Sequence, residues 1–140
     1  MSKNEIYFTK NAEEPKLPLS GAAFLRQKDG TLRARCIAGV FPPLEKIEER
    51  VSIHPKFLMD RLKSQRIAPG EGIIGQAASL RRLIRIEDAL SDKRVIQALP
   101  DSAPIRTLIA APMQLGSQLF GVIAVINKSE KLRHQKVSNN

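Results

Sequence analysis

The segment of this sequence whose spacing best matches a known chemical motif is rich in glycine. Residues 70–75 read Gly-Glu-Gly-Ile-Ile-Gly and match the G-x-G-x-x-G pattern of phosphate-binding loops. Such a loop follows a buried strand and delivers the phosphates to a helix N-terminus. The preceding residues, 62–69, read Leu-Lys-Ser-Gln-Arg-Ile-Ala-Pro, which is not a buried strand. The glycines therefore predict a tight loop at Gly70 and Gly72 and close helix packing at Gly75.

A group of carboxylates is the next candidate for chemistry. Glu87, Asp88 and Asp92 are close in sequence and could act as acid–base groups or as metal ligands. The two histidines, His54 and His134, lie far from them in the sequence, and a metal site would need more ligands. We therefore expect no metal, and helix capping is the favoured role of Asp92.

Nucleophilic catalysis finds little support in the sequence. The single cysteine, Cys36, alternates with apolar residues, so it is expected to be a small buried side chain, and no histidine is near it. No serine occurs in a Gly-x-Ser-x-Gly elbow. We expect no catalytic residues and no enzymatic activity. One cysteine cannot form an internal disulfide and fits a reducing compartment, so the expected location is the cytoplasm.

Composition limits the classes of protein that remain. The chain has 140 residues, 42% hydrophobic and 26% charged, which is typical of one globular domain. No apolar run approaches the roughly 20 residues of a membrane span. The net charge of +9 suggests an anionic partner, but the cations are scattered and aromatic residues make up only 4%. A solvated basic surface is therefore favoured over nucleic-acid binding.

The elements that must position these residues follow from the hydrophobic pattern. Strands are predicted at 20–27 and 31–39, joined by a turn at Asp29-Gly30. A helix is predicted at 55–65, a possible one at 44–51, a short one over residues 73–80 and a helical turn at 91–99. A short strand at 83–86 and two long apolar strands at 106–115 and 119–127 complete the set. The last two should be central in the sheet and covered on both faces.

The order of these segments resembles a GAF domain, the small-molecule-binding sensor module of signalling proteins. The resemblance rests on 70–88 and on 105–128, which end in Gly121-Val-Ile-Ala-Val-Ile-Asn-Lys. It implies an α/β (α+β), GAF/PAS-like fold. A central antiparallel sheet of five or six strands would carry short helices on its pocket side. The expected organisation is an arm at 1–16, a sensor domain at 17–128 and a disordered tail at 129–140.

The resemblance also implies a ligand pocket at the mouth of the sheet. A small molecule would sit between the sheet and a lid formed by residues 41–80, with the helix of 70–80 closing the cavity. Asp88 could equally cap a helix. For each arginine taken alone, a plain structural role is slightly favoured: Arg106 as the start of a strand and Arg94 as a solvated helix residue. Arg94 and Arg106 would hold an anionic or carbonyl group of the ligand. The residues expected to line this pocket are Phe41, Asp88, Arg94, Arg106 and Thr107.

The type of ligand stays open. Asn127-Lys128 matches the first half of the Asn-Lys…Phe…Asp-Glu signature of GAF modules in cyclic-nucleotide phosphodiesterases. Residues 129–140 contain neither Phe nor Asp, so a generic small ligand is favoured over a cyclic nucleotide. The free-methionine-sulfoxide reductases that share this fold depend on several cysteines, and this chain has one.

The implied function is ligand-responsive regulation of an attached or partner output domain, in signal transduction. The helices that flank typical members are not evident, which suggests either a part of a larger protein or association into a homodimer. The alternative function is a protein-interaction or dimerisation module that binds no ligand and docks an acidic protein or a nucleic acid through its basic surface.

Overall fold

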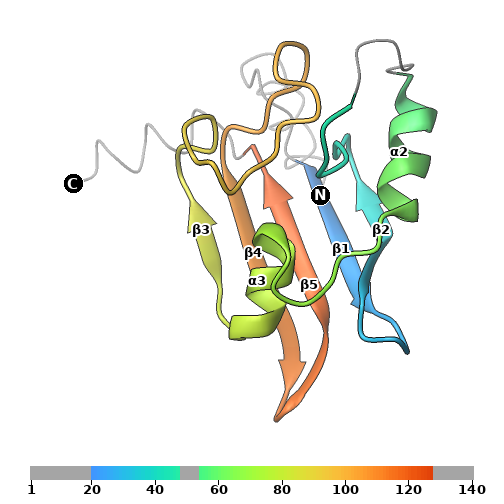
Figure 1. The fold of residues 1–140 in the computed structure, drawn as a ribbon, viewed down its shortest axis with the longest axis vertical. Coiled ribbons are helices and arrows are strands. Elements are labelled where there is room, and N and C mark those ends of the chain that lie inside the picture. The colour runs from blue at the N-terminus through green and yellow to red at the C-terminus, as the bar shows by residue number, and fades with distance from the viewer. Residues whose placement is uncertain (1–19, 48–53, 128–140) are drawn as a thin grey trace, which may run out of the picture.

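The protein forms a five-stranded antiparallel sheet with helices on one side (Figure 1). Its structure is a computed structural model that describes residues 20–47 and 54–127. The strand order is β2-β1-β5-β4-β3. This architecture confirms the α+β fold class predicted from the sequence. The arm at 1–16 and the tail at 129–140 lie outside the described residues.

The first hairpin joins β1 (Ser20–Arg26) to β2 (Leu32–Ala38). Its turn contains Gly30 at a φ of +89°, a conformation that glycine adopts without steric cost. The Asp29 carboxylate accepts hydrogen bonds from the backbone N–H of Thr31 at 2.9 Å and from its hydroxyl at 2.7 Å. The predicted hairpin and its Asp-Gly turn are confirmed.

The second hairpin joins β4 (Leu108–Leu115) to β5 (Gln118–Ile126) through Gly116, whose φ is +62°. The strand β3 (Ile84–Ile86) pairs with the outer side of β4. Because β5 pairs with both β1 and β4, it is the middle strand of the sheet. The predicted central position of both long strands is confirmed.

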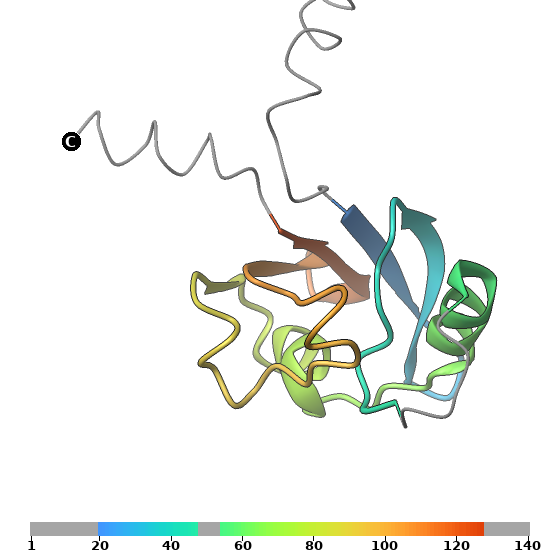
Figure 2. The same cartoon turned by 90° about the horizontal axis from the view of Figure 1, so that it is seen from above.

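The two faces of the sheet differ in burial. Phe24, Val122 and Ile126 point to the inner face and are buried, whereas Ile123 on the outer face is 43% exposed. Figure 2 shows that the helices and the connection from β3 to β4 all lie on the same side of the sheet. Among the described residues, the helices therefore cover one face only. The prediction that both faces are covered does not hold for this part of the chain.

Helix α2 (Pro55–Ser64) packs against β2, and helix α3 (Gly72–Leu80) packs against β4 and β5. Pro55 supplies the first helical residue of α2, where its missing N–H costs nothing. A side chain at Gly75 would clash with the carbonyl oxygen of Ala68, so glycine allows α3 to lie close to the preceding loop. Both helices confirm the sequence prediction to within a few residues.

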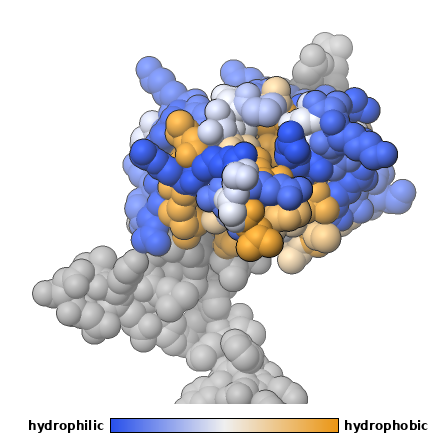
Figure 3. Space-filling model, turned by 90° about the horizontal axis from the view of Figure 1, so that it is seen from below, coloured by the Kyte–Doolittle hydropathy of each residue, from blue (hydrophilic) through white to orange (hydrophobic). Residues whose placement is uncertain are grey.

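Hydrophobic side chains remain exposed near the end of the sheet where the β1–β2 and β4–β5 turns lie. Figure 3 views this end and shows hydrophobic patches between hydrophilic residues. Leu115 flanks the β4–β5 turn, and Phe120 follows it. Leu115 is 77% exposed and Phe120 is 46% exposed.

Within the described residues, no helix has the length and apolar character needed to cross a membrane.

Three local predictions need correction. Cys36 is exposed, not buried, because a β-bulge shifts the register of β1 and β2 between Ala23 and Phe24 and turns Cys36 to the outer face. Residues 91–99 form turns, not a regular helical turn, since the chain there is held by side-chain hydrogen bonds. The possible helix at 44–51 lies partly outside the described residues, and 44–47 are not helical.

Candidate functional site

A partly open cavity of about 90 Å³ lies between the N-terminus of α3, β4 and the connection from β3 to β4. A cavity needs roughly 10–15 Å³ to hold one water molecule, and an engineered apolar cavity of ~150 Å³ binds benzene. The observed space therefore suits a molecule of a few heavy atoms, or one end of a larger molecule. Its walls combine apolar residues with a few polar ones: Leu44, Gln65, Ile67, Glu71, Gly72, Ile73, Ile74, Arg94, Val95, Ile96 and Leu108.

The glycine-rich loop shapes one wall of the cavity. Gly70 and Gly72 have positive φ angles of +88° and +60°, which lets the chain turn sharply into α3. The N-cap residue of α3, Glu71, makes no side-chain capping bond, and its carboxylate instead accepts the Ala68 N–H at 2.9 Å. The first N–H groups of a helix have no partner within the helix, and they carry partial positive charge. The start of α3 can therefore donate hydrogen bonds to a polar group in the cavity.

Arg94 supplies the cation at this cavity, and Asp92 fixes its side chain. The Arg94 Nε lies 3.0 Å from Asp92 Oδ1 and Nη2 lies 2.7 Å from Oδ2, while the backbone N–H of Arg94 also reaches Oδ1 at 2.9 Å. These hydrogen bonds lower the pKa of Asp92 to about 2 and raise the pKa of Arg94. A guanidinium has five N–H groups, so three remain for a ligand.

Two side-chain amides, from Gln97 and Asn127, hold the connection that carries Arg94. The Gln97 side chain accepts the Ile105 N–H and donates to the Ile105 carbonyl, both at 2.8 Å. The Asn127 side chain accepts the Arg106 N–H at 2.7 Å and donates to the Pro104 carbonyl at 3.2 Å. Both amides are satisfied by backbone groups. Asn127 therefore has a structural role at the start of the C-terminal flank of β5, and a cyclic nucleotide stays the less favoured ligand.

Of the five residues expected to line the pocket, the structure brings one to the cavity. Arg94 lines it. Phe41 is buried in the core, where its ring meets that of Phe24 edge-on at 5.9 Å. Thr107 is buried beside β4, whereas Asp88 and Arg106 are exposed. None of these four is among the cavity-lining residues, and ligand contacts for them stay predictions.

The polar residues that sequence reasoning missed are Gln65 and Glu71. Gln65 follows α2, and its Oε1 accepts the Leu44 N–H at 3.0 Å, which fixes the amide at the cavity wall. Gln65 belongs to no motif with known chemistry. Glu71 lies between the first two glycines of the loop, and this position could have indicated that it lies at the start of α3, next to a pocket.

The family of this chain follows from its strand order, from the glycine loop and cavity at the start of α3, and from one comparison with known families. A family model described as "GAF domain" matches residues 19–137, most of the chain. The chain belongs to the GAF domain family. A search of curated protein sequences found no match to this GAF domain.

Solved structures share the fold at low sequence identity. The GAF domain of an Acinetobacter phosphoenolpyruvate-protein phosphotransferase is 16% identical, covering 95% of this chain and 72% of that one, with a TM-score of 0.53. NreA from Staphylococcus aureus, mutated in its nitrate binding site, is 16% identical over 91% and 86%, with a TM-score of 0.52. The reduced form of fRMsr from Staphylococcus aureus is 18% identical over 76% and 53%, with a TM-score of 0.50.

These likenesses show the fold, which regulatory domains and enzymes share. This chain spans about half the length of the staphylococcal fRMsr that it matches. The single cysteine, Cys36, lies on β2 and is not among the residues that line the cavity. Within residues 20–47 and 54–127, no three His, Cys, Asp or Glu side chains form a group that could hold a metal ion.

Proposed function

We propose that this GAF domain is a regulatory module that binds a small molecule in the cavity at the start of α3 and thereby controls an attached or partner output domain. The observation that carries the proposal is the cavity itself, with Arg94 held in place at its wall by Asp92. A preformed pocket with apolar walls and a few oriented polar groups is the usual form of a small-ligand site.

The chemistry of the walls indicates the type of ligand. Arg94 and the start of α3 both donate hydrogen bonds, so the bound group should accept them, as a carbonyl or an anion does. Asp92 and Glu71 place negative charge near the same space, which disfavours a ligand of high negative charge. We therefore infer a small ligand with one carbonyl, carboxylate or comparable group and an apolar remainder. NreA, with its nitrate binding site, supports the inclusion of small inorganic anions among the candidates.

The role is proposed as regulatory, not catalytic. The cavity holds an arginine but no cysteine, histidine or serine among its lining residues. Solved relatives of the same fold include methionine sulfoxide reductases, so this activity is the specific alternative. In a reductase assay with free methionine sulfoxide and a thiol reductant, the full chain should show no turnover above the blank. Turnover that Cys36→Ala abolishes would overturn the regulatory assignment.

A cytoplasmic location and association into homodimers are part of the same proposal. The outer face of the sheet supports association, because apolar residues such as Ile123 remain exposed on it among the described residues. Sedimentation of the full chain across a range of concentrations should show a dimer. A monomer at every concentration would remove this part of the proposal and leave ligand binding unaffected.

A thermal-shift screen tests ligand binding. The panel contains nitrate, acetate, small carboxylic acids and neutral carbonyl compounds, and we expect at least one to raise the melting temperature in proportion to the logarithm of its concentration. Arg94→Ala should abolish the shift. Arg82→Ala is the matched control, since Arg82 is exposed and lies outside the cavity. No shift with any compound, or equal loss in both variants, would contradict the proposal.

A further inference from the structure

Six cationic side chains lie around β2, the edge strand of the sheet, outside the cavity. They come from the end of β1, the hairpin turn and β2, and from the C-terminal end of α2 and the residues after it. Five of the six are exposed and Arg33 is half-buried. We name this group the β2 basic surface, and its members are Arg26, Lys28, Arg33, Arg35, Lys63 and Arg66.

Backbone contacts bring these residues together. Arg33 on β2 donates to the Lys63 carbonyl oxygen, from Nη2 at 3.1 Å and from Nε at 3.4 Å, so it fastens the end of α2 to the edge strand. Leu32 and Ile67 exchange two backbone hydrogen bonds, at 2.8 and 3.0 Å, which place Arg66 beside the hairpin turn. The cations therefore sit on a scaffold that is fixed in the folded protein.

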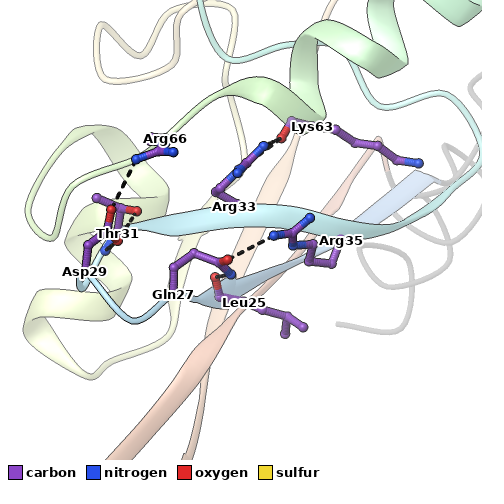
Figure 4. Close-up of polar contacts among 8 residues, drawn as sticks. All are labelled: Leu25, Gln27, Asp29, Thr31, Arg33, Arg35, Lys63 and Arg66. Carbon is purple, nitrogen blue, oxygen red and sulfur yellow. Dashed lines mark hydrogen bonds and ion pairs between the residues drawn. The ribbon is translucent and has the colours of Figure 1, made fainter.

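The partners of these arginines leave most of the charge uncompensated. Figure 4 shows Arg33 directed at the Lys63 carbonyl and Arg35 directed at Gln27, whose Oε1 accepts the Arg35 hydrogen bond at 2.9 Å. Both acceptors are neutral, so they orient the guanidinium groups without cancelling their charge. The carboxylate in contact with this surface is Asp29, 3.3 Å from Arg66. Elsewhere the pattern differs, because Arg61 is neutralised by Glu45 at 2.6 Å.

We propose that the β2 basic surface docks an acidic segment of a protein partner. Guanidinium groups pair with carboxylates in a planar, two-bonded arrangement, and oriented arginines lose less conformational freedom when they do so. The surface contains no aromatic side chain on which the bases of a single-stranded nucleic acid could stack. A chain of carboxylates needs only the cations, so an acidic polypeptide fits this surface better.

The proposal does not depend on whether the cavity holds a ligand. Arg66 lies between Gln65 and Ile67, which line the cavity, but its own side chain is exposed and pairs with Asp29 outside it. The two sites use different side chains. A variant at Arg94 should therefore keep its affinity for the acidic partner, which separates failure of this proposal from failure of the proposed function.

Charge reversal with a matched control tests the docking surface. A fluorescently labelled poly-glutamate peptide is titrated with the full chain, with the double variant Lys28→Glu/Arg35→Glu, and with Arg82→Glu/Arg85→Glu. The two double variants change the net charge equally, and all four residues are exposed. Arg35 does not bond to α2, so its replacement leaves the Arg33 contact in place. Thermal unfolding confirms that each variant is folded.

We expect affinity for the peptide to fall at least about tenfold in Lys28→Glu/Arg35→Glu, a difference of ~1.4 kcal/mol. The loss in Arg82→Glu/Arg85→Glu should be much smaller. Added salt should weaken binding by the parent chain. An equal loss in both variants would show that only net charge matters and would overturn the proposal. Tighter binding of a short DNA duplex than of the peptide, lost in the same variant, would replace the acidic protein with a nucleic acid.

Discussion

Asn127 directly follows β5, and its side chain holds the connection that carries Arg94. Its φ of +57° places it in the left-handed region, which asparagine tolerates better than most residues. Its amide accepts the Arg106 N–H and donates to the Pro104 carbonyl. Loss of this amide would remove both of these partly buried hydrogen bonds.

We therefore predict that Asn127→Ala lowers the free energy of unfolding by about 1–3 kcal/mol, since two hydrogen bonds worth about 0.5–1.5 kcal/mol each are lost. Asn127→Gly is the control for the backbone, because glycine adopts the positive φ freely but supplies no amide. Urea denaturation measures both. A cost close to zero in both variants would mean that the connection is held without Asn127.

Acid should weaken the contact between Asp92 and Arg94. The Arg94 side-chain and backbone hydrogen bonds lower the pKa of Asp92 to about 2 in the folded protein, below its usual value of roughly 3.9. A carboxyl group with a lowered pKa contributes stability above the unfolded pKa, and this contribution is lost as the pH falls through the folded pKa. The difference in stability between the parent chain and Asp92→Asn should be constant near neutral pH and shrink from about pH 4 to about pH 2. A difference that does not change with pH would contradict this account of the contact.

For single residues, the sequence predicted which side chains could bind a ligand more readily than it predicted their hydrogen-bond partners. Arg94 was expected at a ligand pocket and lies at the cavity, because charged residues in a connection stand out against an apolar background. Gln65 and Gln97 could not be assigned, since their roles depend on backbone groups that come close only in the folded chain.

Side chains on the two faces of β5 should contribute differently to the free energy of unfolding. On β5, Ile126 faces the helices and is 1% exposed, while Ile123 faces outward and is 43% exposed. Ile126→Ala should lower the free energy of unfolding by about 2–5 kcal/mol, because it leaves a cavity in the core. Ile123→Ala should cost much less, about 1 kcal/mol or below, as surface substitutions usually do. Chemical denaturation of both variants tests this, and an equal cost would show that the outer face is also covered.

Most elements could be predicted from the sequence because their signals are local. Asp29-Gly30 marked the turn of the first hairpin, and the hydrophobic pattern predicted a helix at 55–65, close to the observed α2. The β-bulge that exposes Cys36 could not be predicted, since it depends on the register between β1 and β2 and not on either strand alone. The same alternation of apolar residues would have buried Cys36 in a regular ladder.

At the scale of the whole molecule, two surfaces have separate proposed roles. The cavity at the start of α3 is proposed to receive a small ligand, and the β2 basic surface is proposed to receive an acidic partner. Both flank the segment of residues 65–67, which leads from α2 toward α3. The fold could be inferred from the order of the elements, but most residues that line the cavity could not be named in advance, because they come from separate parts of the chain that meet only in the folded protein.

The most direct test of the central claim is an amide NMR titration of the full chain with a compound identified in the thermal-shift screen. Binding in the cavity should shift the amide signals of Gly72, Ile73 and Ile74 at the start of α3, and those of Val95 and Ile96 beside Arg94. Arg94→Ala should remove these shifts, while Arg82→Ala should keep them. Shifts confined to other parts of the sheet, or shifts that persist in Arg94→Ala, would contradict the proposal that this cavity is the ligand site.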